Sequence, residues 1–93
     1  MNVVLNHLDE LDFLVRTARR SGMQPEKFAG GMLDAMQKIS ALLAENPPVG
    51  FLEADSALSE ALDGYEKHPG LAGVGKIGNA LVSYRITATS PRR

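Results

Sequence analysis

The chain contains no cysteine and no tryptophan among its 93 residues. Without cysteine it has neither disulfide bridges nor thiolate metal ligands, which excludes a disulfide-stapled scaffold and a zinc finger. Nowhere do eighteen apolar residues follow one another, so we expect no membrane-spanning segment. The formal net charge of -1 provides no global positive field that would attract a nucleic acid.

Positive charge is also missing at the start of the chain, where no lysine or arginine precedes Arg16. This stretch lacks the basic start and apolar centre of a cleaved signal peptide. We therefore expect a cytoplasmic protein or, alternatively, one exported without a cleaved signal peptide. A chain of this length forms one domain, which we assign to residues 1–89, followed by a basic tail at residues 90–93.

Four separate stretches of the chain carry an apolar residue at alternating intervals of three and four positions. This interval places the apolar residues of each stretch on one side of a helix. The stretches are Val4, Leu8, Leu11, Val15 and Ala18; Phe28, Met32, Ala35, Ile39 and Leu42; Phe51, Ala54, Leu58, Ala61 and Tyr65; and Leu71, Val74, Ile77, Leu81 and Tyr84. One-sided helices bury their apolar sides against each other, so the pattern predicts an all-α protein, a small bundle of about four short helices.

Glycine and proline residues set the expected helix ends. The first three helices are expected at about residues 2–21, 25–45 and 51–67. An unbroken register across Gly22 and Pro25 would also permit one long helix kinked at the proline. Because a proline inside a helix costs about 3 kcal/mol, we predict two helices there.

The last element carries two conflicting patterns. Residues 71–84 have helical spacing, although three glycines interrupt them, whereas Val82, Tyr84 and Ile86 alternate as strand residues do. We predict a helix. Charges are also sorted, since residues 45–66 carry only acidic charges and residues 67–93 only basic ones. The third and fourth elements could attract each other. We predict that these charges form the solvated faces of two antiparallel neighbours, and a charged binding patch is the alternative.

Several apolar residues lie off the helical stripes, namely Leu5, Phe13, Leu14, Leu33, Met36, Leu43 and Leu62. A helix of a small bundle buries a face of roughly 100°, and the first two helices carry more apolar surface than that. We therefore predict a non-enzymatic module that binds protein, as a homodimer or as an adaptor or inhibitor of a larger assembly. The predicted contact residues are Phe13, Leu14, Leu33 and Met36.

Residues suited to catalysis are few. His7 and Glu10 are three positions apart and share one side of the first helix, but one histidine and one carboxylate make an incomplete metal site. We expect no catalytic residue, no metal and no cofactor.

The segment Leu71–Lys76 resembles the hairpin of helix-hairpin-helix DNA-binding domains. In that family glycines in the hairpin let backbone N–H groups approach a phosphate. The resemblance implies phosphate contacts at Gly73, Gly75, Lys76 and Arg85. Binding of a nucleic acid is accordingly the alternative function.

A longer segment, residues 48–58 with Ala61, Leu62 and Tyr65, resembles another family. It is similar to the turn and second-helix start of the small WxG-type helical-hairpin proteins exported by type VII secretion systems. Residues 80–85 are similar to the alanine-rich end, containing Tyr-Arg, of their relatives. Such proteins pair into four-helix assemblies and have no active site, so this resemblance implies an exported interaction protein.

Overall fold

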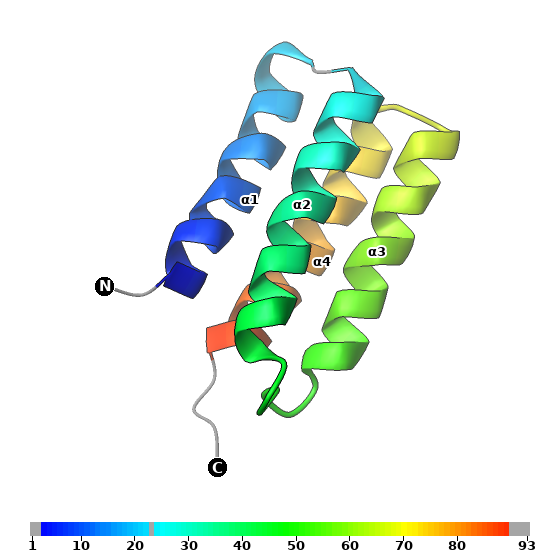
Figure 1. Ribbon diagram of the computed structural model, residues 1–93. Helices are drawn as coiled ribbons and strands as arrows, with labels where there is room; N and C mark the ends of the chain where they lie inside the picture. Colours follow the sequence, from blue (N-terminus) through cyan, green and yellow to red (C-terminus); the bar gives the residue numbers. More distant parts are fainter. Residues whose placement is uncertain (1–2, 23, 90–93) are drawn as a thin grey trace.

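The computed structural model describes residues 3–22 and 24–89, which form four α-helices joined by short turns (Figure 1). The helices are α1 (Val3–Ser21), α2 (Pro25–Leu43), α3 (Phe51–Lys67) and α4 (Leu71–Thr89). The predicted all-α bundle is confirmed, and no strand occurs in the described ranges. None of the described helices is long and apolar enough to cross a membrane. The expected helix start at Asn2 and the tail at residues 90–93 lie outside the described residues.

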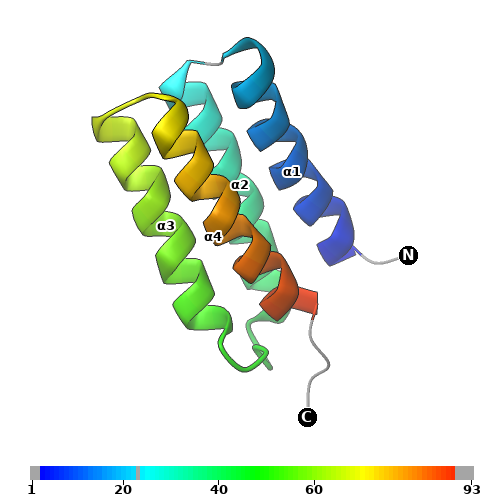
Figure 2. The same ribbon diagram turned by 180° about the vertical axis from the view of Figure 1, so that it is seen from behind.

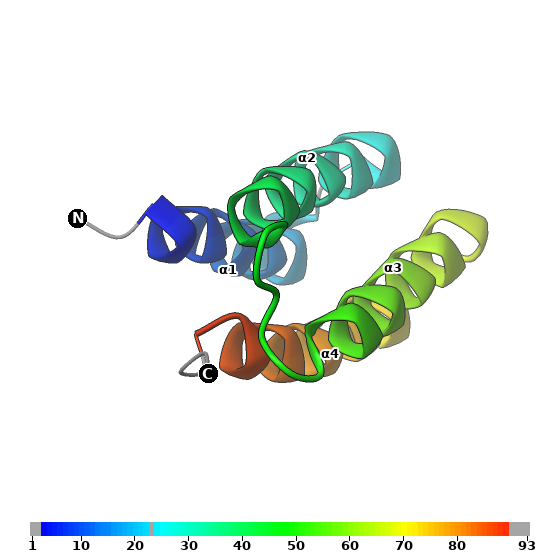
Figure 3. The same ribbon diagram turned by 60° about the horizontal axis from the view of Figure 1, so that its bottom comes forward.

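The four helices run alternately up and down, and each packs against the next (Figures 1 and 2). α4 also packs against α1, which closes the bundle. The contact between α2 and α3 is the smallest of the four. Figure 3 shows α1 and α2 as one layer above a second layer formed by α3 and α4. The bundle therefore consists of two closely packed pairs, α1–α2 and α3–α4, joined mainly through α1 and α4.

Two glycines with positive φ make the turns before α2 and α3. Gly22 follows α1 with φ 74°, and Gly50 precedes α3 with φ 82°, a backbone conformation that residues with a Cβ rarely adopt. Pro25 begins α2, where its missing N–H group would have no helical partner in any case. The prediction of two helices in place of one kinked helix is confirmed.

α2 ends at Leu43, two residues before the predicted end at Glu45. The N–H group of Asn46 donates to the carbonyl of Leu43 at 3.3 Å, and the following Pro47 disfavours a helical conformation at Asn46. The apolar stripe of α2 also differs from the prediction near this end. Leu42 is exposed and Leu43 is buried, because the side of α2 that carries Ile39 and Leu43 faces the core here.

The core is formed by apolar side chains from all four helices, and the described residues bury no charged side chain in it. Two aromatic contacts tie neighbouring helices together. The rings of Phe28 and Tyr65 join α2 to α3, with centroids 5.2 Å apart in an edge-on arrangement. The rings of Phe51 and Tyr84 join α3 to α4, with centroids 5.4 Å apart. Because these contacts lie near opposite ends of α3, they fix that helix along its length.

α4 remains helical as far as Thr89, so the helix predicted over the ambiguous last element is confirmed. Its buried residues recur every three or four positions: Val74, Ile77, Leu81, Tyr84 and Ala88. The hydroxyl of Thr87 donates to the carbonyl of Tyr84 at 3.0 Å, and that of Thr89 to the carbonyl of Arg85 at 2.8 Å. Burial of one helical face thus outweighs the strand preference of the β-branched residues.

The attraction that the sorted charges would allow between α3 and α4 is not formed. No ion pair among the described residues joins these two helices, and Lys67 pairs with Asp63 on its own helix at 3.1 Å. Arg85 of α4 instead pairs with Asp12 and Asp9 of α1, with its Nη2 atom 3.7 Å from Oδ1 of Asp9. α3 and α4 are nevertheless antiparallel neighbours, as predicted. Arg85 reaches α1 because the bundle turns this side of α4 toward that helix.

Two glycines inside helices should respond in opposite ways to substitution by alanine. A Cβ at Gly30 would meet no atom within 4 Å, so Gly30→Ala should raise the free energy of unfolding by about 1 kcal/mol through helix propensity. A Cβ at Gly73 would lie 3.0 Å from Cδ1 of the buried Tyr65, so Gly73→Ala should lower it. Urea denaturation measures both changes. Equal stabilisation by the two substitutions would contradict the close approach of α3 and α4.

Candidate functional site

In the described part of the chain, grooves hollow the surface between several neighbouring helices. One lies between α1 and α2 with a volume of about 430 Å³. Another, about 530 Å³, lies between α1 and α4, and a third of about 280 Å³ lies between α2 and α3. The charged side chains of the described residues lie outside the core, and several of them border these grooves. The grooves therefore differ in the charges along their edges.

The groove between α1 and α2, which we call the acidic groove, is lined by Asn6, Asp9, Glu10, Phe13, Leu14, Gly31 and Asp34. A Cβ at Gly31 would lie only 3.1 Å from Cδ1 of Leu14, so the glycine lets Leu14 settle against α2. The neighbouring Phe13 is not packed against α2 in this way, and its side chain is 66% exposed. The groove therefore combines a half-buried leucine with a largely exposed phenylalanine.

The edge of the acidic groove carries three carboxylates and neither lysine nor arginine. Glu10 lies 2.9 Å from Nδ1 of His7, which confirms that these two residues share one side of α1. Asp34 lies 3.1 Å from Nζ of Lys38. Exposed pairs of this kind are weak and screened by salt, so the edge attracts positive charge. No group of three or more potential metal ligands was found among the described residues.

The four predicted interface residues do not form one surface. Phe13 and Leu14 lie together in the acidic groove, whereas Leu33 lies at the groove between α2 and α3. Met36 is only 3% exposed and belongs to the core, because its side of α2 faces inward. This corrects its assignment as an exposed contact residue. Leu43 and Leu62, also counted as excess apolar surface, are buried too.

The residues implied in phosphate contact also lie apart. The expected hairpin is not formed, since residues 71–76 are the first turns of α4 and the N–H group of Val74 donates to the carbonyl of Gly70 at 3.2 Å. Gly73 packs against Tyr65 of α3. Lys76 and Arg85 lie on opposite sides of α4 because their separation along the helix corresponds to two and a half turns. They do not form a common phosphate site.

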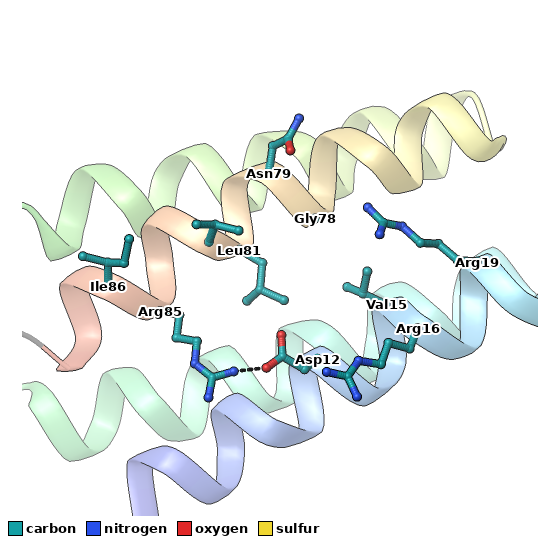
Figure 4. A pocket seen from close by; sticks show the side chains of 10 residues that line it. Asp12, Val15, Arg16, Arg19, Gly78, Asn79, Leu81, Arg85 and Ile86 are labelled. Carbon is teal, nitrogen blue, oxygen red and sulfur yellow. Dashed lines mark hydrogen bonds and ion pairs between the residues drawn. The ribbon is translucent and has the colours of Figure 1, made fainter.

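The groove between α1 and α4, which we call the arginine groove, is lined by Asp12, Val15, Arg16, Arg19, Gly78, Asn79, Leu81, Val82, Arg85 and Ile86 (Figure 4). Arg16 and Arg19 extend from α1, and Arg85 extends from α4 to Asp12. Three guanidinium groups face one carboxylate in this lining, so the arginine groove is positively charged.

The groove between α2 and α3 is lined by Leu33, Met36, Gln37, Ser40, Asp55 and Ser59. Partial burial raises the pKa of the Asp55 carboxyl above its usual value of 3.8. Burial and then the negative charge of Asp55 raise the pKa of Tyr84, whose hydroxyl has no hydrogen-bond partner among the described residues. This groove thus contains a carboxylate that is less well solvated than the exposed ones.

Sequence reasoning did not find Asp34, Arg16 or Arg19 as groove residues. Each fits an ordinary solvated helix surface, and its neighbour lies on another helix. Val82 and Ile86 carried a usable signal, because two apolar residues four positions apart lie off the buried stripe of α4. Their alternation with Tyr84 suggested a strand instead.

No family model, curated protein or solved structure matches this chain. Residues 48–58, which resemble WxG-type proteins, form the turn before α3 and the first half of that helix, and the further resembling residues Ala61, Leu62 and Tyr65 lie in its second half. α2 and α3 are antiparallel neighbours, as a hairpin requires. α1 and α4 then complete a four-helix bundle within this chain, where the resemblance implies a pair of hairpins.

The raised pKa of Asp55 predicts a pH-dependent effect of Asp55→Asn. A pKa raised by folding favours the native state below the usual carboxyl pKa, and this contribution is lost as the pH rises through the folded-state pKa. At pH 7 the neutral amide should therefore raise the melting temperature relative to the wild-type protein. The advantage should disappear below about pH 3.8.

Thermal unfolding of both proteins between pH 3 and pH 7 measures this difference. Asp63→Asn on the same helix is the control, because Asp63 is exposed and should lose only a weak pair with Lys67. An Asp55→Asn protein that is less stable than wild type at pH 7 would mean that the carboxylate stabilises the fold.

Proposed function

We propose that this protein is a non-enzymatic module that binds another protein through its acidic groove. The observation that carries the proposal is Phe13, an aromatic side chain left 66% exposed beside Leu14 in a groove. An exposed aromatic side chain in a recess is typical of a contact that a partner covers, since aromatic residues contribute strongly to protein interfaces. The surrounding polar residues keep the protein soluble while the groove is open.

The charges of the acidic groove point to the chemistry of the partner. Asp9, Glu10 and Asp34 surround the two apolar residues, so a matching surface has basic side chains around an apolar anchor. The groove runs between two antiparallel helices, which suits an amphipathic helix laid along it. The proposed partner segment is therefore a helix with leucine or aromatic residues on one side and lysine or arginine beside them.

The same charges disfavour self-association through this groove. A two-fold homodimer would bring the groove against its own copy, with three carboxylates from each chain. Like charges brought together at an interface oppose binding. The four helices also bury their apolar stripes within one chain. We therefore assign the module to a larger assembly, as an adaptor or inhibitor, in preference to a homodimer.

Removal of the Phe13 ring should weaken partner binding. Phe13→Ala should reduce affinity roughly tenfold or more, because a buried aromatic anchor contributes about 2 kcal/mol to an interface. Tagged wild-type and variant chains would be purified with their bound proteins, and the affinity for the captured partner would be measured by calorimetry. A synthetic helix of about four turns, with leucines on one side and lysines beside them, serves as a defined probe.

Leu52→Ala is the matched control, because Leu52 is also 66% exposed but lies on α3, away from the acidic groove. It should leave binding of the leucine–lysine helix unchanged. Equal losses in both variants, or no binding by wild type at low salt, would refute the proposal. Light scattering could instead show that wild type forms a dimer at high concentration and that Phe13→Ala remains a monomer. This result would assign the groove to self-association.

Export is a separate proposal that follows from the WxG resemblance alone. The intact chain should then be found outside its cell of origin only when a type VII apparatus is present. Retention in the cell with an intact apparatus would exclude export by this route.

A further inference from the structure

The arginine groove has features that the acidic groove lacks. In the described part of the chain Arg16 and Arg19 form neither an ion pair nor a hydrogen bond through their side chains. Arg85, on the opposite side of the groove, is already held by Asp12 and Asp9. Two guanidinium groups therefore remain available along the α1 edge, each able to bind a carboxylate through two N–H groups.

The α4 edge of the same groove carries two exposed aliphatic residues beside Arg85 and Asn79. Val82 is 59% exposed and Ile86 is 61% exposed, although both are large aliphatic residues. They are one helical turn apart and lie beside the buried Leu81 in the groove lining. A partner that covered them would remove this apolar surface from water, which is favourable in proportion to the area covered.

Gly78 leaves room beside α4 for the guanidinium of Arg19. A Cβ at this position would be 2.7 Å from Nη2 of Arg19, closer than atoms approach without moving. The missing side chain lets the guanidinium cross from α1 and rest against α4 (Figure 4). The basic edge is thereby brought within reach of the exposed Val82.

We propose that the arginine groove binds an acidic amphipathic helix of a second protein partner. Its carboxylates would pair with Arg16 and Arg19, while its apolar side covers Val82 and Ile86. The groove is about 530 Å³ in volume and runs between two antiparallel helices, a shape that accepts a helix lengthwise. The positive lining repels the cationic segment proposed for the acidic groove, so the two grooves select different partners.

Binding of two synthetic helices tests this assignment. Both have about four turns and identical leucine positions, and their remaining positions carry either glutamate or lysine. Fluorescence anisotropy should show that the leucine–glutamate helix binds the wild-type protein. Arg19→Glu should weaken this binding roughly tenfold or more, because it replaces attraction by repulsion. Affinity should also fall as salt is added.

Arg20→Glu is the matched control for charge. It makes the same change in the same turn of α1, but Arg20 is exposed outside the groove lining, so the loss should be no more than about twofold. Gly78→Ala is the control for geometry. It keeps every charge and favours the helix by about 1 kcal/mol. The guanidinium of Arg19 ends a flexible side chain and can shift away from the new Cβ, so binding should weaken by no more than about twofold.

Several results would overturn the proposal. One is that the leucine–glutamate helix does not bind the wild-type protein at low salt. Another is that Arg19→Glu and Arg20→Glu weaken its binding equally. A third is that the Phe13→Ala protein binds the leucine–lysine helix as tightly as the leucine–glutamate helix. Displacement by inorganic phosphate at matched ionic strength would assign the groove to small oxyanions instead. Urea denaturation confirms that each variant is folded. Phe13→Ala should leave binding of the leucine–glutamate helix unchanged. A failure of the acidic groove to bind its partner can therefore be distinguished from a failure of the arginine groove.

Discussion

The constraint that shapes this protein is a single apolar core. None of the charged side chains of the described residues is buried in it. Four helices of 17 to 19 residues meet this constraint with one stripe of mostly aliphatic side chains each. The described Asp, Glu, Lys and Arg side chains then lie outside the core, exposed or only partly buried. Differences in function between faces of such a bundle consequently depend on how charges are distributed around the exposed grooves.

The helices themselves were predictable because their apolar spacing and their glycine and proline residues agree. α3 spans the predicted range, and the break at Gly22 and Pro25 is where the chain turns. The ambiguous segment around Val82 shows where local pattern alone is insufficient. Its strand-like alternation is a property of neighbouring residues, whereas the burial of Leu81 and Tyr84 depends on helices distant in sequence. Tertiary packing decides such cases.

The grooves were less predictable because each is made by residues from two helices. The sequence identified Phe13 as an apolar residue off the main stripe but gave Met36 the same status, and only packing separates the exposed ring from the buried thioether. Charge sorting along the chain suggested that α4 could pair with α3. Arg85 instead contacts α1, since antiparallel closure of the bundle makes α1 the other neighbour of α4. Which side chains meet is decided by this order of helices.

The opposite charges of the two proposed grooves follow from the composition of α1, which borders both. The two grooves lie on different sides of α1. Asp9 and Glu10 line the acidic groove, whereas Arg16 and Arg19, together with Asp12, line the arginine groove. Arg85 pairs with Asp9 and Asp12 at the boundary and neutralises charge where the two surfaces approach each other. This pair also joins α4 to α1, the contact that holds the two halves of the bundle together. A single ion-pair cluster thus contributes both to closing the fold and to separating the charges of the two proposed grooves.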